Sequence, residues 1–272
     1  MSAPVVLVTG ITSSIGKAIV RRLAFAGCKV AAADKCPTSV NEVAEENKKV
    51  GGNVVGFAVD VNDKKHRSEL IQRVVQEMGG LDSLVIVPPD NTVRGDIMDT
   101  TVKQFEQVFN DRLTVPFRLT KEALPALKKS KQVFSKFSET YGLNLIVVVF
   151  WNGSVVYLTS CAGYTPGLDI GLFSAASTGV LSLTKNVAAN VAKDGVRVNS
   201  VCFGMVRNDG SGSFWDTNKS EEGLQQLQSM IPLGRLGRPS DAASLVQFLI
   251  SPRARYITGE NCVLNGGVSF RL

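Results

Sequence analysis

Val5-Val-Leu-Val-Thr-Gly-Ile-Thr-Ser-Ser-Ile-Gly16 decides how this 272-residue chain folds. Residues 5–8 form a short apolar run, as in a strand that is buried on both faces. A glycine-bearing turn follows, and apolar residues then recur at the spacing of one helix face: Ile15, Ile19, Leu23 and Ala26. A strand, a tight turn and a helix in this order predict the first unit of a parallel sheet.

The same alternation continues to the end of the chain. Strand-like runs at 29–33, 54–59, 84–87, 154–159, 197–202 and 261–264 alternate with helical patterns at 40–49, 64–78, 102–127, 172–193 and 240–250. Strands that alternate with helices are joined in parallel by right-handed crossovers, which place helices on both faces of the sheet. The sequence therefore predicts an α/β fold with a single doubly wound, Rossmann-like parallel sheet, in one domain over residues 1–272.

One segment, at about 131–151, does not fit this alternation. It ends in Leu145-Ile-Val-Val-Val-Phe-Trp151, which carries no charge and has a strong β propensity. We interpret the segment as an atypical insertion. Three alternatives stay open for it: an extra strand or edge ribbon, an interface, or read-through of untranslated sequence.

The composition is that of a globular protein. Hydrophobic residues make up 44% and charged residues 20% of the chain, which supplies enough apolar material for a core. Five scattered cysteines suit free thiols in a reducing compartment, so we expect the cytoplasm. The one histidine, His66, lies in a charged stretch, so no metal site is expected.

Charge and hydropathy argue against two further kinds of partner. The net charge of +6 is spread along the chain without interleaved aromatic residues, so we do not expect a nucleic-acid partner. No run of eighteen apolar residues is present, so we do not expect a membrane-spanning helix. The positive charge suits an anionic small molecule.

The turn after the first predicted strand has the pattern of a phosphate-binding loop. Glycine permits the tight turn, and the N-terminus of the following helix offers backbone N–H groups to a pyrophosphate. The turn resembles the Thr-Gly-x-x-x-Gly-x-Gly loop of the short-chain dehydrogenase/reductase family, with a serine at the middle glycine. The resemblance implies contacts with NAD or NADP from Thr9, Gly10, Ser14, Ile15 and Gly16. A plain strand–helix turn is the alternative.

Other positions match the family's cofactor site. Asp34 ends the second predicted strand, where a carboxylate accepts a hydrogen bond from a ribose 2′-hydroxyl and repels a 2′-phosphate, so we expect NAD to be favoured. Asp60 and Val61 match the family's adenine contact, and Gly204 lies in the segment that the family places near the nicotinamide. Capping a helix is the alternative role of each aspartate.

The catalytic positions depart from the family pattern. The stretch from Ser154 to Ser177 resembles the active-site segment in which a Ser, a Tyr and a Lys act together. Ser160 is kept, but Phe173 and Ser177 occupy the Tyr and Lys positions, and Arg112 falls where the family has an Asn. In the family, the Tyr transfers a proton and the Lys lowers its pKa while hydride moves. We therefore expect impaired catalysis.

Three further features bear on that expectation. Tyr164 is a candidate for a substitute proton donor, with packing as an aromatic residue as the alternative. Arg112 brings a positive charge to the site or serves as an ion-pair residue. Pro88 and Pro89 stand where relatives have Asn-Asn-Ala-Gly, and two prolines remove two backbone donors beside the expected adenosine.

The C-terminal part resembles the family most closely. Gly234-Arg-Leu-Gly-Arg-Pro and Asn265-Gly-Gly267 are similar to a subgroup of NADPH-dependent carbonyl reductases that end in a peroxisomal tripeptide. The subgroup's use of NADPH conflicts with Asp34. This chain ends in Phe270-Arg271-Leu272, and the phenylalanine breaks the small-residue requirement of that signal, so a peroxisomal location is the weaker alternative.

The resemblance implies an NAD(P)-linked oxidoreductase of small carbonyl or alcohol substrates, with its ordinary catalysis impaired. The alternative is a non-catalytic relative that senses the cofactor or joins active paralogues in an oligomer. Relatives associate through the long helices predicted at 102–127 and 172–193, so the resemblance implies a homodimer or tetramer.

Overall fold

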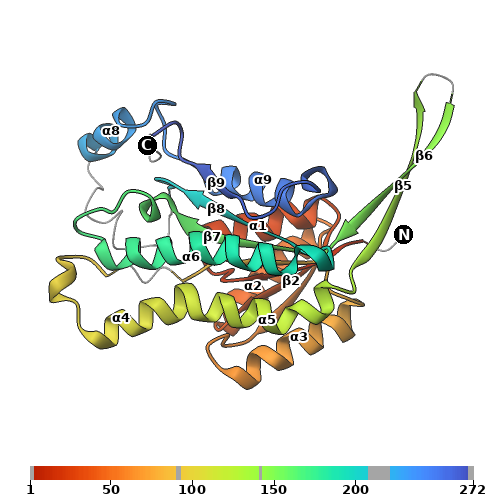
Figure 1. The fold of residues 1–272 in the computed structure, drawn as a ribbon, viewed down its shortest axis with the longest axis horizontal. Helices are drawn as coiled ribbons and strands as arrows, with labels where there is room; N and C mark the ends of the chain where they lie inside the picture. The colour runs from red at the N-terminus through yellow and green to blue at the C-terminus, as the bar shows by residue number, and fades with distance from the viewer. Residues whose placement is uncertain (1–2, 90–92, 141–142, 208–220, 269–272) are drawn as a thin grey trace.

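Seven strands form the main sheet of the structure, a computed structural model that describes residues 3–89, 93–140, 143–207 and 221–268, with the side chains of 131–152 outside the description. The strands are β1 Val5–Thr9, β2 Lys29–Asp34, β3 Asn53–Ala58, β4 Ser83–Ile86, β7 Ser154–Ser160, β8 Arg197–Phe203 and β9 Asn261–Leu264. Their order is β3-β2-β1-β4-β7-β8-β9, and every neighbouring pair is parallel (Figure 1). The predicted doubly wound α/β sheet is confirmed.

Helices cover both faces of this sheet because successive side chains of each strand point to opposite faces. On one face, Val6 and Val8 of β1 pack in a core with α1 Ser14–Phe25, α2 Pro37–Lys49 and α9 Pro239–Ile250. On the other face, Val5 and Leu7 pack with α3 Lys64–Met78, α5 Val115–Leu127 and α6 Gly171–Val191. The strands are buried on both sides, which explains their continuous apolar sequence.

Three details of the helices differ from the prediction. Helix α1 ends at Phe25, so Ala26 is its exposed C-cap, and the expectation of Ala26 on the buried face was wrong. The predicted helix 102–127 consists of α4 Val102–Phe109, a π-helical turn at Asn110–Thr114, and α5. In this turn the N–H of Val115 donates to the carbonyl of Asn110, five residues earlier. The polar helix α8 Glu221–Ser229 was not predicted.

The atypical segment forms an antiparallel ribbon of two strands, β5 Lys131–Thr140 and β6 Leu143–Asn152. The ribbon is a separate sheet that stands away from the body of the molecule (Figure 1). Lys131 is paired with Asn152, so the chain leaves the body and returns to it at neighbouring points. The backbone therefore forms a ribbon, which is one of the alternatives for this segment.

The root of the ribbon lies at the amino edge of the main sheet. The buried carboxylate of Asp82 accepts a hydrogen bond from the N–H of Val5 at 2.7 Å and another from the hydroxyl of Ser130 at 2.6 Å. The hydroxyls of Ser83 and Ser154 are 2.8 Å apart. These contacts tie the end of α5 and the starts of β1, β4 and β7 together, on the edge opposite to the strands' carboxyl ends.

Candidate nucleotide and catalytic site

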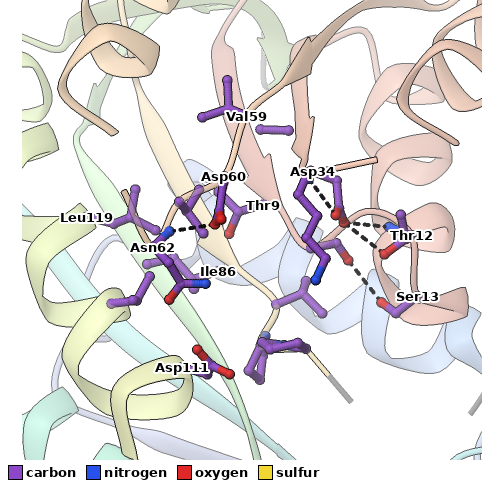
Figure 2. A pocket seen from close by; sticks show the side chains of 18 of the residues that line it. Thr9, Thr12, Ser13, Asp34, Val59, Asp60, Asn62, Ile86, Asp111 and Leu119 are labelled. Atoms are coloured by element: carbon purple, nitrogen blue, oxygen red, sulfur yellow. Dashed lines mark hydrogen bonds between the residues drawn. The ribbon is translucent and has the colours of Figure 1, made fainter. Parts of the chain in front are cut away.

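A cavity of about 540 Å³ opens at the carboxyl ends of β1 to β4, on the edge where doubly wound sheets bind their ligands (Figure 2). It contains five of the positions expected to contact a cofactor: Thr9, Gly10, Asp34, Asp60 and Val61. Four other expected positions do not line this cavity: Ser14, Ile15, Gly16 and Gly204. The sequence therefore located the cavity through the ends of the strands.

Glycine is required at two positions of the β1–α1 turn. Gly10 has a φ of +72°, in the left-handed region, and a Cβ there would collide with the carbonyl oxygen of Val87. A Cβ at Gly16 would collide with the carbonyl oxygen of Gly10. The two glycines let the turn pack closely against itself and against Val87, which follows β4.

Ser13 is the N-cap of helix α1. Its hydroxyl accepts a hydrogen bond from the N–H of Gly16 at 3.0 Å and donates one to the carbonyl of Gly10 at 3.0 Å. Ser14 is the first helical residue and is half-buried, whereas the side chain of Ile15 is buried in the core. The serine before a periodic apolar pattern is a common N-cap signal, so the sequence contained the information to locate this residue.

Asp34 is held by the loop that it faces. One carboxylate oxygen accepts hydrogen bonds from the backbone N–H and the hydroxyl of Thr12, at 3.0 and 2.9 Å (Figure 2). The other accepts the N–H of Lys35 at 2.7 Å. These donors fix the carboxylate at the rim of the cavity and leave it lone pairs for a hydroxyl ligand. The sequence did not predict the contribution of Thr12.

A buried arginine, Arg67, holds the loop after β3 through hydrogen bonds to its backbone carbonyls. Asp60 accepts the N–H of Asn62 at 2.9 Å within this loop. Arg67, which is 1% exposed, donates to the carbonyls of Val61 and Asn62 at 2.8 and 2.9 Å and pairs with Glu122 at 3.2 Å. Arg67 was not predicted, because these contacts need the folded chain. It holds the wall that carries Asp60.

Gly204 directly follows β8, at the carboxyl edge of the sheet, where it packs against Asn265. Its N–H donates to the carbonyl of Leu264 at 2.9 Å, and an added Cβ would approach the Cβ of Asn265 to 2.9 Å. Glycine therefore permits the close approach of the two segments that follow β8 and β9.

Ser160 ends β7, and its hydroxyl has a structural partner. The side chain is 8% exposed and accepts a hydrogen bond from the N–H of Ala162 at 3.1 Å, which begins the short helix Cys161–Gly163. Tyr164 is half-buried and packs against a small cluster of Cys161, Leu181 and Cys202. This packing is the alternative role considered for Tyr164.

The substituted positions contact one another. The guanidinium of Arg112 lies 4.4 Å from the ring centroid of Phe173, a cation–π contact, and donates to the carbonyl of Pro89 at 2.9 Å. Ser177 donates its hydroxyl to the carbonyl of Phe173 at 2.8 Å, within α6. Arg112 lies on the π-helical turn and is 6% exposed. A continuous chain of contacts therefore runs from the turn after β4 to the first turn of α6.

Known proteins share this fold and sequence. The Homo sapiens protein "Dehydrogenase/reductase SDR family member 4" is 31% identical over 268 residues, which are 98% of this chain and 88% of that protein. The chain belongs to the short-chain dehydrogenase/reductase family. The Mus musculus protein of the same name is 30% identical over 272 residues, 100% of this chain and 89% of its own length.

Two family models agree with this membership. A model described as short chain dehydrogenase matches residues 4–133, and one described as Enoyl-(Acyl carrier protein) reductase matches residues 144–269. The stretch between the two matches lies within the ribbon, so the family models skip part of the insertion.

Solved structures of this family superpose on nearly the whole chain. A dehydrogenase/reductase from Sinorhizobium meliloti 1021 is 25% identical, with a TM-score of 0.82 over 99% of this chain and 96% of its own. A variant of actinorhodin polyketide ketoreductase, solved with NADPH, is 26% identical, with a TM-score of 0.85 over 98% of this chain and 99% of its own. Family membership makes the chain a relative of oxidoreductases.

Three sequence-based expectations concern what else the chain binds or where it goes. In the part that the structure describes, no helix has both the length and the apolar character to cross a membrane. The same described residues hold no cluster of three or more metal-ligating side chains. The C-terminal tripeptide at 270–272 lies outside the described residues.

Proposed function

We propose that this chain keeps the adenosine end of the family's nicotinamide-dinucleotide site and does not carry out the family's ordinary reduction of carbonyls or oxidation of alcohols. One observation carries the proposal: Phe173 stands at the Tyr position with Arg112 over its ring, and the hydroxyl of Ser177 is bonded within its own helix. The altered positions form a packed contact, while the nucleotide cavity persists.

The chemistry follows from the side chains. Phenylalanine has no O–H group, so it cannot donate a proton to a carbonyl oxygen. The Ser177 hydroxyl carries no charge with which to lower the pKa of a neighbouring acid. Losing a general acid alone typically costs about 10²–10⁴ in rate. Any residual turnover would act on small carbonyls or alcohols through Ser160, as in the NADPH-dependent carbonyl reductase subgroup that the C-terminal part resembles.

Calorimetric titration tests the binding half of the proposal, and a panel of carbonyl substrates with NADH and NADPH tests the catalytic half. We expect saturable dinucleotide binding with turnover at least about 10²-fold below that of an active family member. Fast turnover would overturn the proposed loss of catalysis. Any slow turnover should disappear in Ser160→Ala, and turnover that survives in this variant comes from another site.

We infer that NAD is preferred to NADP, because the Asp34 carboxylate at the rim of the cavity would repel a 2′-phosphate. The exposed Lys35 beside it offsets part of this repulsion. Asp34→Asn should weaken NAD binding and strengthen NADP binding, each by about tenfold. Asp63→Asn is the matched control, since Asp63 caps α3 outside the cavity. An unchanged ratio in Asp34→Asn would contradict the preference.

A second candidate function is a partner role in an oligomer, as either a homo-oligomer or a complex with active paralogues. Apolar side chains are exposed along α4 and α5: Val102 is 74%, Phe105 44% and Phe117 45% exposed. We propose that these helices pair with those of a second subunit, because side chains of this kind gain free energy when water is removed from them. Sedimentation should show a dimer or tetramer that Phe105→Glu with Phe117→Glu converts to monomer; a wild-type monomer would contradict this role.

A further inference from the structure

The described cavity covers only part of a dinucleotide site. A dinucleotide in a doubly wound sheet lies across the point where strand order reverses, here between β1 and β4. The lining residues come from the ends of β1 to β4 and from the α4–α5 segment. None of the positions expected near the nicotinamide lines this cavity: Ser160, Phe173, Ser177 and Gly204.

The cavity has the chemistry of an adenosine pocket. Val61, Ile86 and Leu119 supply apolar walls. Asp60 and Asn62 bring carboxylate and amide groups to the same space (Figure 2). Asp34 faces it from the end of β2, where a ribose hydroxyl would be accepted. Gly10 and Ser13, in the turn before α1, also line the cavity, and the N-terminus of a helix offers backbone N–H groups to a diphosphate.

Side-chain contacts connect this pocket to the catalytic positions. Pro89 lines the cavity. Its carbonyl oxygen accepts a hydrogen bond from the guanidinium of Arg112 at 2.9 Å. The same guanidinium stacks on Phe173 at the beginning of α6. Two contacts therefore connect the turn after β4 with the first turn of α6, the two segments that carry Pro89 and Phe173. The residues present fit the adenosine end of the cofactor and do not fit its nicotinamide end.

We propose that this site binds the adenosine diphosphate group on its own, so that ADP-ribose and ADP bind as well as NAD does. This inference rests on the proposed nucleotide binding and deepens it, since the ligand class becomes adenine nucleotides whether or not they carry a nicotinamide. The occupancy of such a site depends on the concentration of adenine nucleotides and not on whether a nicotinamide dinucleotide is oxidised or reduced.

The test is a calorimetric titration of the full chain with NAD, ADP-ribose, ADP and nicotinamide mononucleotide. We expect the dissociation constants of NAD and ADP-ribose to agree within about threefold, and no saturable binding of nicotinamide mononucleotide. NAD binding tenfold or more tighter than ADP-ribose, about 1.4 kcal/mol, would overturn the inference while leaving the proposed function in place. If the chain bound none of NAD, NADP and ADP-ribose, the proposed function itself would be overturned.

A variant pair tests the bridge directly. Arg112→Asn should shift the ratio of affinities towards NAD by about tenfold, with ADP-ribose unchanged. Arg118→Asn, an exposed arginine on α5, should leave the ratio as it is. If thermal melting shows that Arg112→Asn is unfolded, Phe173→Ala removes the other half of the contact. A folded variant with an unchanged ratio would show that Arg112 and Phe173 do not exclude the nicotinamide.

The fluorescence of NADH gives a readout that does not depend on affinity. A change in emission here means a shift of the emission wavelength, because enclosure by protein shifts the wavelength of a nicotinamide, whereas separation of the nicotinamide from the adenine ring alters mainly the intensity. We expect calorimetric binding of NADH without a change in emission for the wild-type chain, and a change in Arg112→Asn. A change in the wild-type chain would contradict the inference.

Discussion

Arg112 and Phe173 stack on one another, with 4.4 Å between the guanidinium carbon and the ring centroid. By the resemblance of the sequence, they stand at two positions where the family has an asparagine and a tyrosine, and they come from different helical segments. Pro89, in the altered turn after β4, accepts a hydrogen bond from the same guanidinium. Three departures from the family pattern are thus one connected structure, so reversing one of them leaves the others in place.

Restoring catalysis should therefore require three changes. Phe173→Tyr with Ser177→Lys supplies the proton donor and its charged partner, but Arg112 still covers the ring and places a second positive charge beside the lysine. Adding Arg112→Asn should raise carbonyl reduction by about 10²–10⁴ over the double variant, measured from NADH or NADPH absorbance. Arg118→Asn in the double variant is the control. A double variant as active as the triple variant would show that Arg112 is no obstacle.

A buried hydroxyl pair links β7 to α5. The Tyr157 hydroxyl lies 2.8 Å from that of Thr120, and Thr120 donates to the carbonyl of Pro116 at 2.8 Å. Tyr157 therefore donates to Thr120, and burial raises the pKa of Tyr157 above its ordinary value, which keeps it protonated. Tyr157→Phe should cost about 1 kcal/mol of unfolding free energy, and Thr120→Val about 1–3 kcal/mol, because it strands the buried tyrosine hydroxyl. Urea unfolding measures both.

The double variant of this pair provides the check. Tyr157→Phe with Thr120→Val removes both polar groups, so its cost should be smaller than the sum of the single costs. Additive costs would contradict the coupling between the two hydroxyls.

The ribbon should be dispensable for the fold. Lys131 and Asn152 are paired, so replacing residues 132–151 by Asn-Gly joins them with a two-residue hairpin turn. The shortened chain should melt within about 2 °C of the full chain and bind NAD equally well. Asp82→Ala, which removes the carboxylate that holds Val5 and Ser130, should instead lower the melting temperature clearly. A shortened chain that fails to fold would show that the ribbon stabilises the sheet.

The cysteines should differ in reactivity. The hydroxyl of Ser39 lies 3.4 Å from the sulfur of Cys36, and hydrogen bonds from Ser39 lower the pKa of this thiol. Burial raises the pKa of Cys28 to about 11. Because the thiolate is the reactive form, iodoacetamide at neutral pH should label Cys36 well before Cys28, as followed by mass spectrometry.

Ser39→Ala should slow the labelling of Cys36 several-fold and leave the labelling of Cys28 unchanged. Faster labelling of Cys28 in the wild-type chain would contradict the assignment.

The sequence predicted the sheet well because each buried strand is a local apolar run, and each strand end marks one edge. Asp34 and Asp60 were found by this rule. The bonds that hold them were not, since Thr12 reaches Asp34 across 22 residues of sequence and Arg67 acts on backbone carbonyls. Nothing in a linear pattern reports such contacts.

The same limit applies to the catalytic positions. The sequence showed that Arg112, Phe173 and Ser177 were unusual, but not that the first two touch, because their contact depends on how α4, α5 and α6 pack. The π-helical turn that carries Arg112 was also missed, as the apolar spacing of 102–127 looks like one continuous helix.

That turn affects how the segment could change in evolution. A π turn contains one residue more than the α-helical turn it replaces, so the helices on its two sides are out of phase by about 100°. This offset allows α4 to pack on α6 while α5 packs on α3 and β4. Deleting one codon within 110–114 would rotate one helix relative to the other and expose a face that is now buried, so the length of this turn is constrained even where its side chains are free to change.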